Sequence, residues 1–461
     1  MINQIFKKTK YTFKASIEQI INKKYWNSIP AIEMDEKLNF GINGGSKLIV
    51  EDLNNDGCNE FIWIQTAGIF KSKIYEKSSE IKIYKNNIGQ EDVFCITSTD
   101  EKGIIQWQIG KPWEGDKPYL CHGHEQIIVT ADVNGDGFQE LLTFDAGNKL
   151  LIINFKGEII KEIILPNDNF SIVYFVKTGS GKNDFILVIG TMDIGYSPHP
   201  YANPWLILDN NFEIISCKDY LGAGHNIVID DINGDGIPEL LIGYQLVNIK
   251  GQIIWTLDYW KDKEIDSLEQ HIDCVQSHWV DGEWFATISG SDKQYYLNAK
   301  GEALWVKTLP HPQYNLIGKY NGELRIFVAN QREIMNSFSI DGIEKWNGLL
   351  PEHWPSGKPV LINEKRPIHI NEPLYLIPNS NSYSDDYFIY TEGGWPFIAN
   401  FNGRVKLRFQ WPSEHSQFKF TNQFRRINDI GESFDVVIDN QNNIHIYNRW
   451  NVWTYNLTVL K

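Results

Sequence analysis

Three stretches of the sequence align without gaps and share one unit: an apolar segment, a short acidic loop and a second apolar segment. They are VEDLNNDGCNEFIWI (50–64), TADVNGDGFQELLTF (130–144) and IDDINGDGIPELLIG (229–243). Each loop reads D-x-N-x-D-G, and a glutamate follows its last glycine three residues later. Short apolar runs bounded by turn residues predict β-strands. A strand–loop–strand unit that recurs along the chain therefore constrains it to a repetitive all-β fold.

A second motif recurs beside the first. It is an Asn- or Asp-containing turn, usually with a glycine, followed by a strand that often ends in tryptophan. The copies are DEKGIIQW (100–107), NFKGEIIK (154–161), DNNFEIIS (209–216), NIKGQIIW (248–255), NAKGEALW (298–305), SIDGIEKW (339–346), NFNGRVKL (400–407) and, more weakly, DNQNNIHIY (439–447). We interpret them as hairpin turns between the two outer strands of each repeat. We expect the tryptophans at their ends to pack between neighbouring repeats.

Together the two motifs allow four strands in each repeat. The expected repeat boundaries lie near 40–112, 122–165, 168–218, 224–260, 271–308, 311–350, 355–411 and 415–456. The sequence therefore predicts an all-β fold, an eight-bladed β-propeller with four-stranded antiparallel blades. A lead-in segment (1–39) precedes this single domain (40–461). A seven-bladed propeller is the alternative, in which 355–456 forms one irregular blade.

Oxygen-bearing side chains alternate along each D-x-N-x-D-G loop, which is the donor chemistry that calcium prefers. The glycine permits the sharp turn that such a loop requires. We therefore expect about three calcium sites that stabilise the fold. The expected ligands are Asp52, Asn54 and Asp56; Asp132, Asn134 and Asp136; and Asp231, Asn233 and Asp235. The following glutamates, Glu60, Glu140 and Glu239, either complete the coordination or cap the turn.

Charge and apolar content exclude two classes of partner. With 43 Lys+Arg against 58 Asp+Glu, the formal net charge is −15, which argues against nucleic-acid binding. No apolar run is long enough to cross a membrane. The N-terminal segment lacks the features of a secretory signal, so we expect a cytoplasmic protein, or a secreted one if the N-terminus was trimmed. The five cysteines form no metal-binding or disulfide pattern, and the sequence leaves the oligomeric state open.

Histidines recur where four of the repeats begin, in CHGHEQ, AGHN, QHID and LPHPQ. The loop that enters the innermost strand of a propeller blade lies at the mouth of the central channel. The calcium loops follow that strand and belong to the opposite face, whereas loops between the second and third strands return to the histidine face. The residues expected at this rim are His124, His225, His271 and His311, with Asp273 and Gln313 beside them, and His199, Tyr201 and Arg332 from returning loops.

The D-x-N-x-D-G loops resemble the FG-GAP or VCBS repeats of integrin α-subunits and many bacterial propellers. The longer pattern, with GHN ahead of INGDG and then NIKGQIIW, QHID, NAKGEALW and HPQ, resembles rhamnogalacturonan-lyase-type propellers. That resemblance implies an eight-bladed propeller, bound calcium and β-elimination on a uronic-acid-containing polysaccharide or oligosaccharide.

Such a rim suits β-elimination, in which the sugar carboxylate is neutralised, a neighbouring proton is removed and the leaving oxygen is protonated. We expect Arg332 or a metal to neutralise the carboxylate. A rim histidine or Tyr201 is then the base or acid. The residues expected to bind substrate are His199, Gln313, Asp273 and, by stacking on a sugar ring, Trp395. The rim histidines alternatively bind an additional divalent metal.

Two other functions remain open on the same scaffold. One is a non-catalytic propeller that binds a glycan or a protein, and the other is an intracellular enzyme of different chemistry, such as a cyclase or isomerase. A histidine at a strand entrance also commonly serves only as a hydrogen-bonding turn residue. The histidines outside the pattern are expected to be structural or on the surface: His278, His353, His369, His415 and His445.

Overall fold

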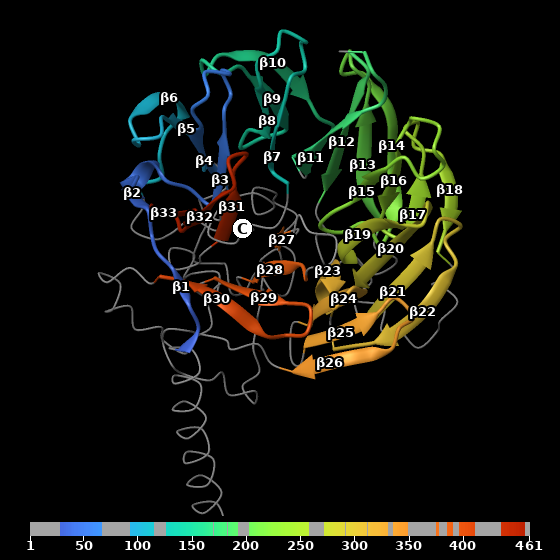
Figure 1. Cartoon of the computed structure of the whole chain (residues 1–461). Coiled ribbons are helices and arrows are strands. Elements are labelled where there is room, and N and C mark those ends of the chain that lie inside the picture. Colours follow the sequence, from blue (N-terminus) through green and yellow to red (C-terminus); the bar gives the residue numbers. More distant parts are fainter. Residues whose placement is uncertain are drawn as a thin grey trace, which may run out of the picture.

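The computed structural model describes residues 28–66, 93–114, 126–168, 170–181, 183–191, 202–257, 272–290, 292–310, 312–330, 335–348, 375–377, 385–390, 396–410 and 435–456. These residues form eight β-sheets arranged in a ring (Figure 1). The predicted eight-bladed β-propeller is confirmed, and the seven-bladed alternative is wrong. No helix in the described ranges is long and apolar enough to span a membrane.

The first four blades each take their four strands, from the innermost outward, in chain order. Blade 1 contains β3 (Lys47–Glu51), β4 (Glu60–Thr66), β5 (Phe94–Thr99) and β6 (Ile105–Gly110). Blade 2 contains β7 (Ile128–Ala131), β8 (Glu140–Phe144), β9 (Lys149–Ile153) and β10 (Ile159–Ile164). Blade 3 contains β11 (Phe170–Lys177), β12 (Phe185–Thr191), β13 (Ala202–Leu208) and β14 (Ile214–Leu221). Blade 4 contains β15 (Val228–Asp230), β16 (Glu239–Ile242), β17 (Gln245–Val247) and β18 (Ile253–Thr256).

Blades 5 and 6 follow the same order, and blades 7 and 8 also recruit strands from the start of the chain. Blade 5 contains β19 (Ile272–Val280), β20 (Glu283–Gly290), β21 (Lys293–Asn298) and β22 (Ala303–Thr308). Blade 6 contains β23 (Pro312–Tyr320), β24 (Glu323–Asn330), β25 (Met335–Ser339) and β26 (Glu344–Gly348). Blade 7 contains β27 (Tyr375–Ile377), β28 (Tyr387–Tyr390), β29 (Phe397–Asn400), β30 (Val405–Phe409) and β1 (Ala31–Ile32). Blade 8 contains β31 (Asp435–Ile438), β32 (Asn443–Tyr447), β33 (Asn451–Asn456) and β2 (Glu36–Asn39).

The ring is closed by the N-terminal part of the described chain. Strand β2 pairs antiparallel with β33 and supplies the outermost strand of blade 8. Asn39 Nδ2 donates a hydrogen bond to Asn451 Oδ1 across this pair at 2.8 Å. Strand β1 adds to the outer edge of blade 7 in parallel with β30. Residues 36–39, at the end of the expected lead-in segment, are therefore part of a propeller sheet.

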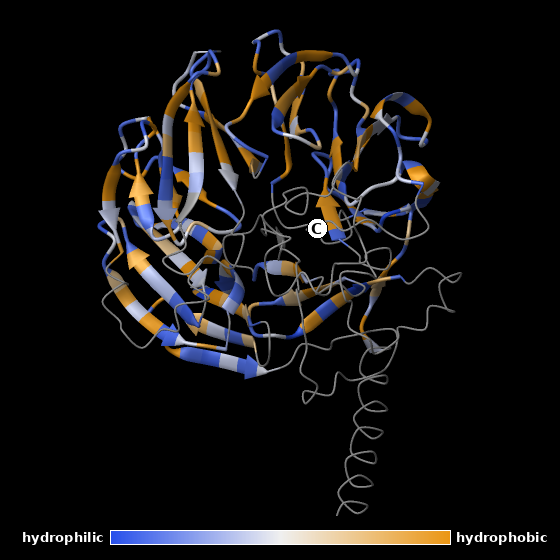
Figure 2. Ribbon diagram, turned by 180° about the vertical axis from the view of Figure 1, so that it is seen from behind, coloured by the Kyte–Doolittle hydropathy of each residue, from blue (hydrophilic) through white to orange (hydrophobic). Residues whose placement is uncertain are grey.

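Apolar residues fill the layers between neighbouring blades, and hydrophobic residues recur along the strands of each blade (Figure 2). The predicted inter-blade role of the outer tryptophans is confirmed. Trp107 Nε1 donates to the Phe155 carbonyl of the next blade at 2.8 Å. Trp255 and Trp305 repeat this bond to the next blade at 2.9 and 2.8 Å. Each tryptophan thus ties its blade to the following outer hairpin.

The Asn/Asp turns join the third and fourth strands in blades 1–7, as predicted. In blade 2, Asn154 Oδ1 accepts hydrogen bonds from the amides of Lys156 and Glu158 at 3.0 and 2.9 Å. Gly157 follows with a φ of +79°. The weak eighth copy differs, because its Asp439 turn joins β31 and β32, the first and second strands. The expected outer position is wrong there, since β2 already supplies the fourth strand.

Candidate functional site

The acidic loops join the first and second strands of blades 1, 2 and 4, as predicted. In blade 1, Asp52 accepts hydrogen bonds from the amides of Asp56 and Gly57 at 3.1 and 2.9 Å. Asn54 Oδ1 also accepts from the Asp56 amide, at 2.8 Å. The loop of blade 4 repeats all three contacts, and the loop of blade 2 repeats the last two. The side-chain oxygens at alternate positions therefore gather around one turn in each loop.

The glutamate after each loop caps it. Glu60 accepts hydrogen bonds from the Leu53 amide and from Asn54 Nδ2, both at 2.9 Å. Glu140 and Glu239 make the corresponding pairs of bonds in blades 2 and 4. Burial, with a further contribution from the loop aspartates, raises the pKa of all three glutamates. The glutamates were expected either to complete the coordination or to cap the turn, and their hydrogen bonds cap the turn.

The donor chemistry of the loops fits calcium. Each loop offers two carboxylates and one amide oxygen around the same turn, all hard oxygen donors. Within the described ranges no three His, Cys, Asp or Glu side chains gather as a metal-binding group. Asp52, Asn54 and Asp56, with their counterparts in blades 2 and 4, are the residues that would hold such an ion, and the glutamates hydrogen-bond to the same loops.

Three of the ten residues expected at the rim or in substrate binding lie in the described ranges: His225, Asp273 and Gln313. The other seven lie outside them: His124, His199, Tyr201, His271, His311, Arg332 and Trp395. His225 stands just before β15, while Asp273 and Gln313 are the second residues of β19 and β23. Since the acidic loop of blade 4 follows β15, these residues belong to the opposite face, as predicted.

His225 and Asp273 come together from adjacent blades. The imidazole Nε2 lies 3.8 Å from Asp273 Oδ1, and the two side chains are 13% and 2% exposed. An imidazole beside a buried carboxylate is suited to accept a proton, because the carboxylate stabilises the imidazolium that forms. This pair is therefore the described part of the rim best suited to proton transfer.

Blade 4 holds the pair in place through a close backbone contact. The Ile272 amide donates to the Gly222 carbonyl at 2.9 Å, and the His225 amide donates to the Ile272 carbonyl at 3.2 Å. A Cβ on Gly224 would lie 1.9 Å from the Ile272 carbonyl oxygen, so only glycine allows this approach. The loop that carries His225 is thus fixed against the strand that carries Asp273.

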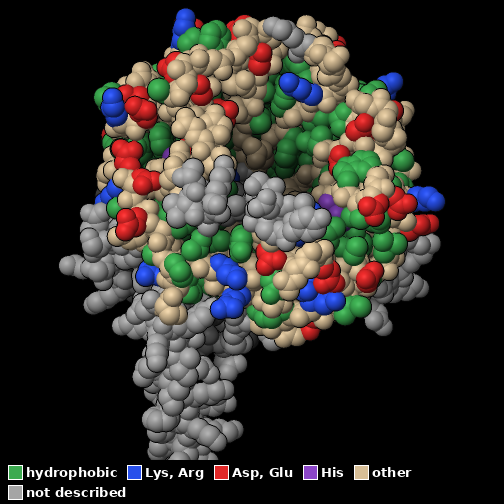
Figure 3. Space-filling view, viewed as in Figure 1, with side chains coloured by type: hydrophobic (Ala, Val, Ile, Leu, Met, Phe, Trp, Pro, Cys, Tyr) green, Lys and Arg blue, Asp and Glu red, His purple; other side chains and the backbone are tan. Residues whose placement is uncertain are grey.

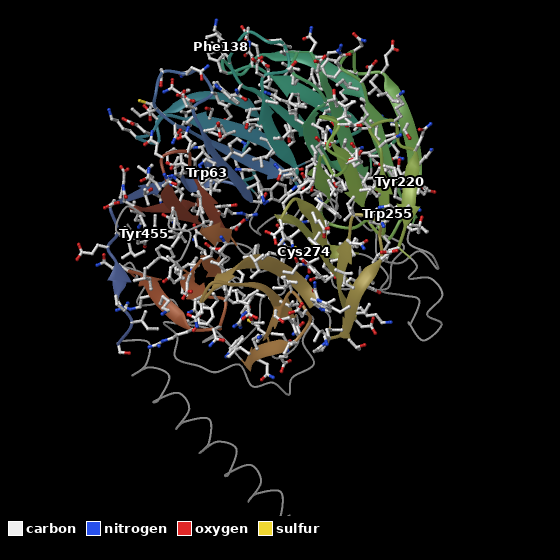
Figure 4. All side chains as sticks on the ribbon, turned by 45° about the vertical axis from the view of Figure 1, so that its right-hand side comes forward. Trp63, Phe138, Tyr220, Trp255, Cys274 and Tyr455 are labelled. Atoms are coloured by element: carbon white, nitrogen blue, oxygen red, sulfur yellow. The ribbon has the colours of Figure 1, made fainter. Side chains whose placement is uncertain are left out.

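Asparagine side chains of the two neighbouring blades hydrogen-bond to the backbone of β19. Asn226 Oδ1 of blade 4 accepts a hydrogen bond from the Val275 amide at 3.0 Å. Asn315 Nδ2 of blade 6 donates to the Cys274 carbonyl at 3.1 Å. Cys274 lies toward the middle of the ring (Figure 4). The strand beside the rim pair is therefore anchored to both neighbouring blades.

Three innermost strands contain a β-bulge at the same place, near their first residue. The register of β19 against β20 shifts around Asp273, and that of β23 against β24 shifts around Gln313. The register of β11 against β12 shifts in the same way around Ser171. Bulges re-aim side chains and are enriched beside active sites. Ser171 is not among the residues predicted from the sequence. The first three residues of β11, β19 and β23 are FSI, IDC and PQY, and each of these strands has a polar residue in second place.

The space-filling view shows the ring hollowed at its centre (Figure 3). The innermost strands of all eight blades surround this centre (Figure 1). The residues at the starts of β11, β15, β19 and β23 therefore belong to the mouth of the channel over four consecutive blades.

The histidines outside the repeat pattern have structural contacts where they are described. His445 Nε2 is hydrogen-bonded to Asp439 Oδ2 at 3.1 Å within blade 8. His278 Nε2 is hydrogen-bonded to the Tyr296 hydroxyl at 3.0 Å within blade 5. His353, His369 and His415 lie outside the described residues.

The sequence matches no protein-family model and no curated protein. Among solved structures, the exotype rhamnogalacturonan lyase YesX is 13% identical, with 93% of this chain and 74% of that chain covered and a TM-score of 0.58. The Bacillus licheniformis rhamnogalacturonan lyase PL11 is 11% identical, with the same coverage and a TM-score of 0.54. The V. cholerae biofilm matrix protein Bap1 is 10% identical, with 94% and 92% covered and a TM-score of 0.55. At these identities the likeness shows that this chain shares their fold.

Proposed function

We propose that this protein is a calcium-stabilised β-propeller that cleaves a uronic-acid-containing glycan by β-elimination at the mouth of its channel. The observation that carries the proposal is the pair formed by His225 and Asp273, whose imidazole and buried carboxylate lie 3.8 Å apart. The fold shared with two rhamnogalacturonan lyases supports the choice of reaction, and the step from fold to activity is an analogy.

In the proposed reaction, neutral His225 accepts the proton from the sugar carbon that bears the carboxylate. The electron pair of the broken C–H bond forms a carbon–carbon double bond, and the C–O bond on the next carbon breaks. The leaving oxygen takes a proton from solvent and becomes a free hydroxyl, and the His225 imidazolium then returns its proton to solvent, so atoms and charge balance. Asp273 stabilises the imidazolium that forms on His225. The substrate carboxylate needs a positive partner, for which the sequence offers Arg332.

Calcium at the three acidic loops is proposed as a structural element on the face opposite to the reaction. Its support is the donor set repeated in blades 1, 2 and 4 and the carboxylates crowded in each loop. A bound cation would offset the mutual repulsion of these carboxylates and hold each loop in its turn.

The test is to follow absorbance near the unsaturated-uronate band while acidic polysaccharides and their oligomers are screened with added calcium. A rise with one substrate supports the lyase and identifies its sugar. His225→Gln is then expected to reduce turnover by about a thousandfold, because it removes the proton acceptor. His278→Gln, at the far end of β19, is the matched control and should keep activity. A flat trace across the panel, with calcium loading confirmed, would contradict the lyase and favour a glycan- or protein-binding propeller.

A further inference from the structure

The acidic loops of blades 1 and 2 are in direct contact. In the described part of the chain, two hydrogen bonds join them. Asn55 Nδ2 donates to the Gly137 carbonyl, and the Gln139 amide donates to the Leu53 carbonyl at 3.1 Å. Each of these four residues is next in sequence to an expected calcium ligand or to a capping glutamate. The contacts therefore connect the parts of the two loops that would hold the ions.

Leu53 ties the loop of blade 1 to blade 2 by packing as well. Its side chain is fully buried, in an apolar cluster that includes Leu141 and Leu151 of blade 2. Its amide donates to Glu60 at 2.9 Å, while its carbonyl accepts from Gln139. The backbone of Leu53 thus connects the capping glutamate of blade 1 to the loop of blade 2.

Asn55 occupies a position that is glycine in the other two acidic loops. Its φ is +58°, and those of Gly135 and Gly234 are +75° and +77°. Glycine adopts a positive φ without steric cost, whereas an asparagine pays for it in backbone strain. The asparagine side chain therefore contributes something that glycine does not, and its hydrogen bond goes to Gly137 in the next blade.

Blade 4 offers an internal comparison. The turns between the first and second strands of blades 3 and 5 do not have the D-x-N-x-D-G sequence. The acidic loop of blade 4 thus has no acidic loop in either neighbouring blade, whereas those of blades 1 and 2 are neighbours.

The two contacts let the order of one loop reach the other. Without a cation the carboxylates of a loop repel one another, so holding them around one turn is unfavourable. A cation in one loop fixes that turn, and with it Leu53 and Asn55 against the loop of blade 2. A second cation then meets a loop that is already partly ordered, which is positive cooperativity. Repulsion between the two ions opposes this effect, but salt screens charges over about 8 Å at physiological ionic strength.

We propose that the acidic loops of blades 1 and 2 bind calcium with positive cooperativity, and that the Asn55 side chain carries part of the coupling. The inference rests on the proposed function in so far as these loops bind calcium, and it adds how two of the three sites influence each other. The two ions are then taken up over a narrower range of calcium concentration than independent sites would allow.

The experiment uses the full chain with Asp235→Ala, which leaves the sites of blades 1 and 2. Calcium is titrated in competition with a chelating dye at physiological ionic strength. Asn55→Gly keeps every expected ligand and every charge, and it introduces the residue that the other two loops have. We expect it to raise the product of the two dissociation constants about threefold to tenfold, which is the effect of one lost neutral hydrogen bond.

Proteins with a single site separate coupling from an effect within one loop. Adding Asp56→Ala or Asp136→Ala to Asp235→Ala leaves one site, and Asn55→Gly should change its Kd by less than about twofold. The Kd at blade 4, measured in the protein with Asp56→Ala and Asp136→Ala, should be equally insensitive. An increase of Kd in a one-site protein as large as that of the product would show that Asn55 acts within its own loop and would overturn the inference.

Asn442→Gly is the matched control. Asn442 is also an asparagine with a positive φ, +64°, and it lies in the turn between the first and second strands of blade 8. This change should leave both dissociation constants of the two-site protein as they are. If it raised their product as much as Asn55→Gly does, backbone flexibility alone would explain the result and the inference would fall.

The remaining outcomes separate this inference from the proposed function. Unchanged binding when Asn55→Gly is made in the two-site protein would overturn the inference and leave calcium as a structural element. Absence of bound calcium in the wild type would overturn the inference and the structural calcium together, while the elimination assay would still decide the lyase.

Discussion

Asn59 in the acidic loop of blade 1 donates a hydrogen bond from Nδ2 to Asp439 Oδ2 of blade 8 at 3.1 Å. The same carboxylate oxygen is hydrogen-bonded to His445 Nε2 at 3.1 Å and accepts from Asn443 Nδ2 at 2.9 Å. Burial alone raises the pKa of Asp439, but the hydrogen bonds from His445 and Asn443 outweigh it and hold the pKa below its usual value. The loop proposed to hold calcium is thus joined to the blade that closes the ring.

Asp439→Ala is expected to lower the free energy of unfolding by about 2–4 kcal/mol, because it leaves buried donors without their acceptor. Asn59→Ala should cost about 1 kcal/mol. In a double-mutant cycle measured by urea unfolding, the two changes should be non-additive by about 0.5–1.5 kcal/mol. Strict additivity would show that the contact does not couple blade 1 to blade 8.

Removing calcium with a chelator is expected to lower the melting temperature of the wild type. The physical reason is that the crowded carboxylates of each loop then repel one another. Native mass spectrometry should count about three bound calcium ions, one for each acidic loop. Asp56→Ala, Asp136→Ala and Asp235→Ala should each remove one ion and part of the effect of the chelator. An unchanged melting temperature in chelator would reject calcium as a stabiliser.

Gly301→Ala tests the contact between outer tryptophans and the hairpins of the next blade. Gly301 has a φ of +76°, and a Cβ there would lie 2.6 Å from the Trp255 ring. Gly282 is the matched control, with a φ of +83° and nothing within 4 Å of the added Cβ. Gly282→Ala should cost about 1 kcal/mol from backbone strain alone, and Gly301→Ala about 2–4 kcal/mol. Equal losses of unfolding free energy for the two variants would show that the Trp255 ring shifts aside without destabilising the fold.

His278 gives the fold a pH dependence whose sign follows from its environment. Burial lowers the pKa of this imidazole to about 4, so the folded protein keeps it neutral. A depressed histidine pKa contributes stability that is present above about pH 6.5 and is lost as the pH falls toward 4. Between pH 7 and pH 4.5 the free energy of unfolding should fall by about 1–2 kcal/mol more in the wild type than in His278→Gln. This difference is reduced to account for the partial exposure of the ring. Parallel losses would show that His278 does not titrate in this way.

The sequence by itself determined the repeat and the four-stranded blade, and it favoured eight blades while leaving seven open. It also determined the acidic loops between first and second strands and the face on which His225 and Asp273 lie. These features follow from residues close together in the chain. The alternation of apolar and polar residues predicts a strand, and an Asx turn such as that of Asn154 predicts a hairpin. The spacing of Asp52, Asn54 and Asp56 predicts a tight acidic loop.

The tertiary structure alone decided how the ring closes and which polar residues reach the mouth of the channel. Ring closure pairs Asn39 with Asn451, which lie 412 positions apart in the chain. Which distant strand pairs with the open edge of a blade leaves no signal in the residues near either strand. Because β2 supplies the outermost strand of blade 8, the Asp439 turn lies between the first and second strands of that blade. The bulge at Ser171 is a relation of register between two strands, which one strand's residues do not encode. Local patterns therefore specified the blades, while long-range pairing specified the closure and the site.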